Sequence, residues 1–156
     1  MCAVYLSKFD YLPMEQIPVY ASMGGVENEN WLTRTPHSHD FEEIVAITEG
    51  RGRHMIDGKP YEVRAGDVFL IQKDQEHYFS ERKCMGYMNI AFLKEGLPLP
   101  WNELKALAGF YAFLEIDTVL RSARRAIAHV RLNNVDFLEF STLAREMIRQ
   151  SSDGST

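Results

Sequence analysis

The stretch PHSHDFEEIVAITEG, residues 36–50, decides the fold of this chain. Its alternation is typical of a β-strand, in which successive side chains point to opposite faces. One face of the predicted strand carries His37, His39, Phe41, Glu43, Val45 and Ile47. Two imidazoles and one carboxylate are therefore expected on the same side.

A third histidine, His77, comes from a second stretch, GDVFLIQKDQEHYF, residues 66–79. Strand signals there cover residues 68–71 and residues 77–80, the latter beginning at His77. If the strand that begins at His77 lies beside the first one, its imidazole joins the earlier group. The expected cluster comprises His37, His39, Glu43 and His77.

The spacing of these residues resembles the two motifs of the cupin barrel. The first cupin motif has two histidines one residue apart, a glutamate four positions on and a glycine seven later. This chain supplies them as His37, His39, Glu43 and Gly50. The second motif runs from a glycine to a histidine eleven positions on, as Gly66 and His77 do.

The chain departs from the second motif at Gln72 and Asp74, where Pro and Gly are usual, and at Glu81, where Asn is usual. These departures weaken the match to enzymatic cupins and leave the barrel prediction intact. The longer run HDFEEIVAITEGRGRHMIDGKPYEVRAGDVFLIQKDQEH is similar to the effector-binding domain of AraC-type bacterial transcription regulators, in the rhamnose-regulator branch. The resemblance implies a mostly β cupin barrel, a double-stranded β-helix or jelly roll, followed by C-terminal helices.

Composition indicates one globular domain. The chain has 156 residues, of which 46% are hydrophobic and 25% charged, and a chain of this length buries about 70% of its unfolded surface. Its formal net charge of −5 argues against a broad nucleic-acid interface, because phosphate contacts need clustered Lys and Arg.

Cysteine use and hydropathy favour a cytoplasmic protein. Cys2 and Cys84 lie far apart, and the N-terminal sequence MCAVYLSKFD has neither the basic start nor the apolar run of a signal peptide. No apolar run approaches the roughly 18 residues that a membrane span needs. We expect reduced thiols and no membrane partner.

The chain divides into four predicted segments. Residues 1–30 form an N-terminal arm with a short strand at 19–23, and residues 31–93 form the barrel core. In the core, Asp57-Gly58 predicts a tight hairpin and Glu81-Arg82-Lys83 predicts a further turn. The family resemblance implies that the arm packs near the ligand, and an ordinary leading edge of the barrel is the alternative.

Residues 94–133 are expected to complete the barrel, with a short helix at 101–108 and another strand at 110–116. The basic run RSARRAIAHVR that follows is interpreted as a solvated face rather than a nucleic-acid patch.

Residues 134–150 form the clearest predicted helix. Asn133 or Asn134 can cap its start, and Asp136 complements the helix dipole. Its apolar arc comprises Phe137, Phe140, Leu143, Ala144, Met147 and Ile148. This arc could cover the chain's own barrel, or it could pair two subunits in a homodimer, as the family resemblance implies.

The regulators that this chain resembles continue with a pair of helix-turn-helix units. Nothing after Gln150 could supply that DNA-binding domain, so we expect it to be absent here. DNA contact would then come only through such a C-terminal domain.

The cluster of imidazoles and one carboxylate suits Zn, Ni, Fe or Mn. The resemblance to metal-binding cupins points to His37, His39, Glu43 and His77 as the ligands. The alternative is a polar cluster that hydrogen-bonds a sugar or only itself. His54 and His129 are interpreted as unrelated to this site.

Two functions follow from this pattern. The preferred one is a sensor that binds a small polar effector, such as a sugar, inside the barrel and transmits the event to an attached DNA-binding half. Its candidate ligand contacts are Trp31, Arg53, Tyr61, Tyr78 and Tyr87. The alternative is a metal-dependent cupin enzyme of the dioxygenase or isomerase type, with an open coordination position. The altered second motif and the helical tail favour the sensor over the enzyme.

Overall fold

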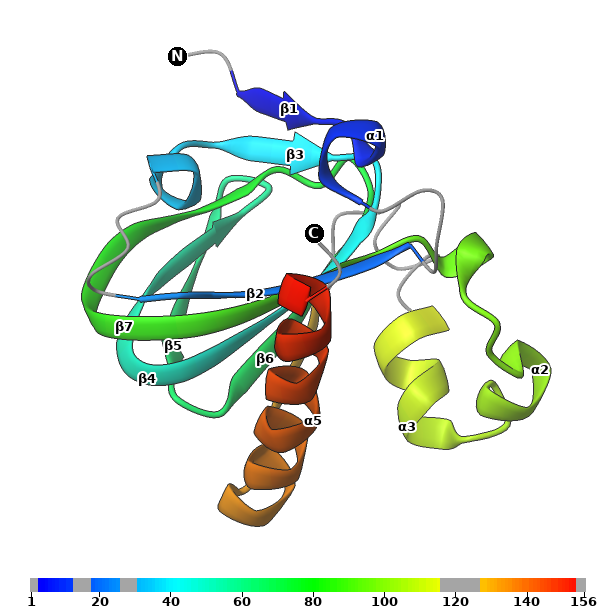
Figure 1. Ribbon diagram of the computed structural model, residues 1–156. Helices are drawn as coiled ribbons and strands as arrows, with labels where there is room; N and C mark the ends of the chain where they lie inside the picture. Colours follow the sequence, from blue (N-terminus) through cyan, green and yellow to red (C-terminus); the bar gives the residue numbers. More distant parts are fainter. Residues whose placement is uncertain (1–2, 13–17, 26–30, 116–126, 154–156) are drawn as a thin grey trace.

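Two long antiparallel strands, β4 (Glu42–Ile56) and β7 (His77–Phe92), form the centre of the fold in the computed structural model (Figure 1). The structure describes residues 3–12, 18–25, 31–115 and 127–153. β4 pairs with β6 (Asp67–Ile71) through its first half and with β5 (Lys59–Arg64) through its second half. The two halves of β4 therefore pair with different strands, and the sheet curves between these strands.

Further strands extend this sheet at both edges. Its order is β1-β3-β7-β4-β6-β8, with β2 also paired to β7 and β5 to β4. The added strands are β1 (Val4–Leu6), β2 (Val19–Gly24), β3 (His37–His39) and β8 (Ala128–Arg131). The predicted strand at 19–23 is thus part of the sheet, where it pairs antiparallel with the end of β7.

The predicted hairpin at Asp57-Gly58 is confirmed. It joins β4 to β5, and both residues have positive φ, 48° and 75°. A two-residue primed turn needs this left-handed backbone, because its twist matches that of the flanking strands.

The predicted turn at Glu81-Arg82-Lys83 is wrong, because β7 continues through these residues. The pairing of β4 with β7 instead shifts register near Glu49 and Arg51. Gly50 lies at this irregularity with φ 68°, and a Cβ there would lie 2.0 Å from the carbonyl oxygen of Cys84. Residues 81–83 themselves pair with residues 51–53, so the irregularity lies beside them and not in them.

Alternation divides the buried side chains between the two faces of the sheet. The inner face carries an apolar cluster of Val45, Ile47, Ile56, Val63, Phe69, Ile71, Phe79, Met85 and Tyr87. The outer face carries Ala21, Leu70, Met88, Ile90 and Phe92, which lie under helical segments. The fold thus has a core on each side of one sheet.

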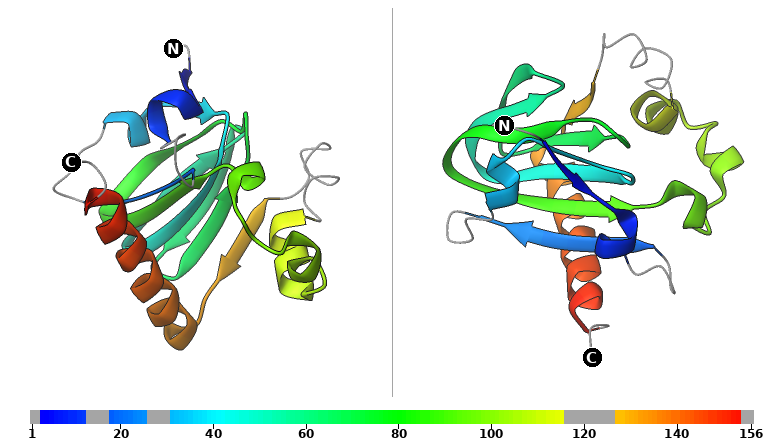
Figure 2. Two further views of the ribbon diagram at one scale, coloured as in Figure 1. Left: turned by 45° about the vertical axis from the view of Figure 1, so that its right-hand side comes forward. Right: turned by 90° about the horizontal axis from the view of Figure 1, so that it is seen from above.

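Helix α5 (Asn134–Asp153) runs along the outer face (Figure 2). Asn133 caps it, since its Oδ1 accepts from the backbone N–H groups of Val135 and Asp136. The face of α5 that meets the sheet comprises Phe140, Ala144, Met147 and Ile148. Leu143, also in the predicted apolar arc, does not meet the sheet, because its side chain is 63% exposed at the edge of this face.

Short helical pieces follow β7 within residues 94–115. They are η2 (Lys94–Gly96), α2 (Trp101–Leu104), α3 (Ala108–Phe110) and η3 (Tyr111–Glu115), after α1 (Lys8–Tyr11) and η1 (Trp31–Arg34) earlier in the chain. The predicted strand at 110–116 is therefore wrong over its described part. Phe113 and Leu114 pack on the outer core, and with Phe110 they have the i, i+3, i+4 spacing of a helix.

Most of the basic run RSARRAIAHVR lies outside the described residues, and its last four residues form β8. Among the helices that the structure describes, none combines the length and the apolar character that crossing a bilayer requires.

Candidate functional site

Three strand segments bring the predicted polar residues together. β3 meets β7 at the pair His37 and His77, and β4 begins three residues after β3 without changing the alternation of faces. His39, Glu43 and His77 are all buried, and one donor atom from each lies within 4.8 Å of the others. The structure thus unites three of the four predicted metal ligands.

The donor atoms of this group face one another. Glu43 Oε2 lies 3.6 Å from His39 Nε2 and 3.4 Å from His77 Nε2. None of these three atoms has a hydrogen-bond partner among the described residues. Ligand atoms that share one ion at bond lengths near 2.1 Å lie about 3.0–3.4 Å apart, so the three residues fit a metal ion of the zinc class.

The tautomer of His39 strengthens this fit. Its Nδ1 lies 2.7 Å from the carbonyl oxygen of Phe41, so Nδ1 carries the proton and donates it. Nε2 of the neutral ring then presents a lone pair to the carboxylate of Glu43. A ring nitrogen and a carboxylate oxygen that face each other in a buried site suit either a metal ion or a proton between them.

His54 lies behind His77, a neighbour that the sequence reading treated as unrelated. His54 Nε2 is 3.2 Å from His77 Nδ1, and the ring of His54 is fully buried. His77 can ligate through Nε2 only if its Nδ1–H donates to His54 Nε2. Simple alternation from Glu43 would turn His54 to the other face. The register shifts near Gly50 reverse the alternation of β4 and bring His54 inward with Gly52 and Ile56.

Burial keeps these imidazoles neutral. It lowers the pKa of His54 to about 3 and the pKa of His77 well below its ordinary value, and the neighbouring His37 lowers both further. A neutral ring is the form that binds a metal or accepts a hydrogen bond from a ligand.

His37 stands beside the group rather than in it. Its Nδ1 lies 2.8 Å from the carbonyl oxygen of Thr35, and burial lowers the pKa of its imidazole. Its ring centroid is 4.3 Å from that of His77 and 6.5 Å from that of His39. Among the described residues, the converging donor set therefore contains His39, Glu43 and His77 without His37.

Four of the five predicted ligand contacts divide between the two faces of the sheet. Tyr61 and Tyr87 lie with the inner core. Arg53 lies on the opposite face, where it pairs with two carboxylates, Glu62 and Glu81, and Tyr78 also faces outward because its neighbours His77 and Phe79 face inward. The side chain of Trp31 lies outside what the structure describes.

Further polar groups near Tyr87 were not identified from the sequence. The guanidinium of Arg82 lies 5.6 Å from the centre of the Tyr87 ring and donates to Thr33 Oγ1 at 3.2 Å. Asn89, two residues after Tyr87 on the same face, has a buried Oδ1 without a partner in the described part of the chain. The inner face thus offers polar groups for a ligand beyond the histidine cluster.

A mostly β domain with buried, unpaired polar groups on the inner face of its sheet has the construction of a small-ligand-binding domain. A family model described as the AraC-like ligand binding domain matches residues 21–148, and the chain belongs to this family. The predicted mostly β cupin fold with a helical C-terminal part is confirmed.

Curated relatives extend beyond this chain. It is 28% identical over 116 residues to the HTH-type transcriptional activator RhaR of Escherichia coli O139:H28, covering 74% of this chain and 37% of that protein. RhaR of Escherichia coli O9:H4 is 34% identical over 76 residues, with 49% and 27% covered. The chain thus spans little more than a third of the length of the first relative. Among solved structures, a cupin protein from Bacteroides fragilis is 27% identical, with 52% and 69% covered and a TM-score of 0.40.

Proposed function

We propose that this chain is the effector-binding and dimerisation domain of an AraC-type transcription regulator, and that it senses a small polar ligand of the sugar class on the inner face of its sheet. The observation that carries the proposal is the buried group of His39, Glu43 and His77, whose facing atoms lack partners among the described residues. Membership of the AraC-like ligand-binding family supports it.

The proposal includes one divalent ion, Zn, Ni, Fe or Mn, held by His39 Nε2, Glu43 Oε2 and His77 Nε2. When bound, such an ion supplies Lewis-acid positions to which ligand hydroxyl groups can coordinate. The protein residues then orient the ligand. Tyr61 and Tyr87 provide aromatic walls, and Asn89 Oδ1 can accept from a ligand hydroxyl.

The N-terminal arm is the element that would move when a ligand binds. β1 pairs in parallel with β3, so that Val4 lies opposite His37 and Leu6 opposite His39. The backbone N–H of Asp74 donates to the carbonyl oxygen of His39 at 2.8 Å, and the hydroxyl of Tyr5 lies 3.5 Å from the Asp74 carboxylate. A ligand that shifts β3 would therefore shift the arm.

Helix α5 is the proposed dimer contact. Its sheet-facing side is already covered, but Val135, Leu138 and Leu143 outside that contact are 75%, 69% and 63% exposed. Large apolar side chains exposed on a helix favour a partner, and a second copy of the chain fits the twofold symmetry of most homo-oligomers.

Contact with DNA is assigned to a helix-turn-helix domain of the full-length regulator, in the cytoplasm. The net charge of −5 supports this division, because an acidic domain binds phosphate backbones poorly.

A titration with monosaccharides and polyols tests the proposal. Isothermal calorimetry on zinc-loaded protein is expected to find a ligand whose affinity falls at least about tenfold in Glu43→Gln, which removes the only carboxylate of the group. The matched variant Glu42→Gln lies one residue away on the outer face and should bind the same ligand normally. Equal affinity of the wild type, Glu43→Gln and Glu42→Gln would show that the inner cluster does not bind the ligand.

The metal-dependent enzyme is the second candidate, and the donor set is what favours it. Two histidines and one carboxylate are also the ligands of non-haem iron oxygenases. Oxygen consumption by the iron-loaded protein with a panel of candidate substrates distinguishes an enzyme from a sensor. Turnover that disappears in His39→Ala would favour the enzyme, whereas stoichiometric binding without turnover would favour the sensor.

A further inference from the structure

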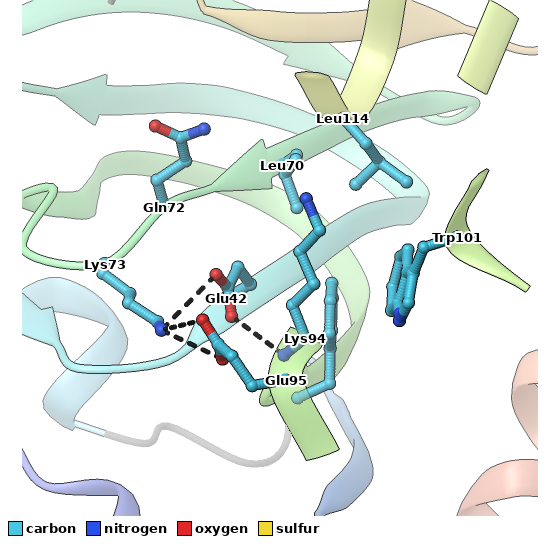
Figure 3. Close-up of a pocket in the computed structure, with 9 residues that line it drawn as sticks. Glu42, Leu70, Gln72, Lys73, Lys94, Glu95, Trp101 and Leu114 are labelled. Atoms are coloured by element: carbon cyan, nitrogen blue, oxygen red, sulfur yellow. Dashed lines mark hydrogen bonds and ion pairs between the residues drawn. The ribbon is translucent and has the colours of Figure 1, made fainter. Parts of the chain in front are cut away.

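A cavity of about 320 Å³ opens on the outer face of the sheet (Figure 3). Its floor is formed by strands β4, β6 and β7, and its walls by η2, α2 and η3. The lining residues are Glu42, Leu70, Gln72, Lys73, Phe92, Lys94, Glu95, Trp101 and Leu114. The volume is at the lower end of the range of small-molecule sites, so a metabolite fits and a peptide does not.

The sheet separates this cavity from the histidine cluster. Glu42 is the residue before Glu43, and Leu70 is the residue before Ile71, so each lining side chain of the floor points away from the inner face. The cavity is therefore a different site from the proposed effector site.

One end of the cavity carries an excess of negative charge. Lys73 Nζ lies 3.2 Å from Glu95 Oε1 and 3.8 Å from Glu42 Oε1, so one ammonium group faces two carboxylates. Burial raises the pKa of Glu42, with Lys73 opposing that effect. A second positive group at this end would be stabilised by the carboxylate that Lys73 only partly neutralises.

The other end is positive and apolar. Figure 3 shows the side chain of Lys94 extending between Leu70 and Trp101, and its ammonium lies 5.4 Å from the centre of the Trp101 ring. Leu70 and Phe92 are almost fully buried and Leu114 packs against them. This end offers one cation and a broad apolar and aromatic wall.

The geometry points to a small zwitterion with an apolar side chain, the class of free apolar α-amino acids, as the ligand of this cavity. Its ammonium group pairs with Glu42 and Glu95, its carboxylate pairs with Lys94, and its side chain lies on Leu70, Leu114 and Trp101. Two lysines and two glutamates make the lining neutral in sum, which suits a ligand that is dipolar rather than charged.

Three probe compounds test separately the contribution of each charged group of this ligand. L-Phenylalanine carries both charges, 3-phenylpropionate lacks the ammonium group and phenethylamine lacks the carboxylate. The readout is the indole N–H resonance of Trp101, which donates to the Leu97 carbonyl at 3.3 Å, together with calorimetry. EDTA-treated protein is used, so that the result does not depend on the proposed metal or effector site.

L-Phenylalanine is expected to shift the Trp101 indole resonance and to bind at least about tenfold more tightly than either analogue, because each lost charge removes a charge-assisted hydrogen bond. Glu42→Gln and Lys94→Gln should each weaken it by a similar factor. Glu103→Gln, an exposed carboxylate of α2 outside the lining, should leave it unchanged.

Three results would overturn the inference. They are an unchanged Trp101 resonance at millimolar L-phenylalanine, equal binding of all three compounds, and full binding by both Glu42→Gln and Lys94→Gln. L-Leucine serves as a second zwitterion, and its failure where L-phenylalanine succeeds would restrict the ligand class to aromatic amino acids.

Discussion

At the scale of single residues, His54 decides which nitrogen of His77 is available on the inner face. Its Nε2 lies 3.2 Å from His77 Nδ1, and a proton held on Nδ1 leaves the lone pair of His77 on Nε2. Removing the orienting partner of a metal-binding histidine typically lowers metal affinity about 10–100-fold.

His54→Phe is therefore expected to weaken zinc binding about 10–100-fold, while the protein stays folded because the phenyl ring fills a similar volume. Calorimetric titration with zinc measures the change. Met55→Leu, the neighbouring residue in β4, is the control and should bind zinc as the wild type does. Unaltered affinity in His54→Phe would show that His77 does not need this partner.

The sequence was informative at this scale where strand alternation applied. It placed His39 and Glu43 on one face because alternation persists from β3 into β4. It missed His54 and Asn89, whose roles depend on which strands become neighbours across the sheet. It also grouped Arg53 and Tyr78 with the ligand contacts by residue type alone. Tyr78 faces outward by alternation with His77, and Arg53 faces outward because the irregularity near Gly50 reverses the alternation of β4.

At the scale of elements, an ion-pair cluster fixes β8 to β6. The fully buried carboxylate of Asp67 accepts two hydrogen bonds from Arg131, at 2.7 and 2.8 Å, and one from His129 at 2.9 Å. Burial alone would raise the pKa of Asp67, but these hydrogen bonds outweigh it and hold the pKa below its ordinary value.

Asp67→Asn is expected to lower the free energy of unfolding by about 2–3 kcal/mol, because hydrogen bonds to charged groups are lost. The folded-state pKa is lowered, so the carboxylate stabilises the fold above the ordinary carboxyl range and loses this effect as pH falls through the lowered pKa. Urea unfolding measured from neutral pH to pH 3 should show that the free energy of unfolding falls less on acidification in Asp67→Asn than in the wild type. Parallel pH curves for the two proteins would contradict this.

Helix α5 allows a packed and an exposed apolar side chain to be compared directly. Met147 packs on the sheet, so Met147→Glu should destabilise the fold by at least about 2 kcal/mol. Leu143, one turn before Met147 at the edge of the same face, is 63% exposed, so Leu143→Glu should change monomer stability by less than about 0.5 kcal/mol. Thermal unfolding of dilute protein measures both, and the reverse order would mean that the helix lies rotated on the sheet.

The sequence predicted α5 well because its cap and period are local features, and the helix begins at Asn134 as expected. It failed at residues 81–83 and 110–115 for a tertiary reason. A bulge opposite Gly50 let β7 continue past its charged residues, and packing of Phe113 and Leu114 on the outer face favoured helical turns over an alternating strand.

At the scale of the whole molecule, assembly through α5 is the proposal that sedimentation can test. The wild type is expected to be a dimer, and Leu138→Glu combined with Leu143→Glu is expected to give folded monomer, because two charges in an apolar contact cost several kcal/mol. Circular dichroism confirms the fold of the variant. A wild type that stays monomeric at high concentration, or a variant that stays dimeric, would place the subunit contact elsewhere or remove it.

The central claim is that His39, Glu43 and His77 form one metal-binding centre inside the sheet. The most direct measurement is anomalous diffraction at the zinc, nickel, iron and manganese edges from crystals of the metal-loaded protein, with elemental analysis of the same sample. One anomalous peak per chain, bonded to His39 Nε2, a Glu43 oxygen and His77 Nε2 and missing in His39→Ala, is the predicted result. No peak at this position, or a peak that persists in His39→Ala, would contradict it.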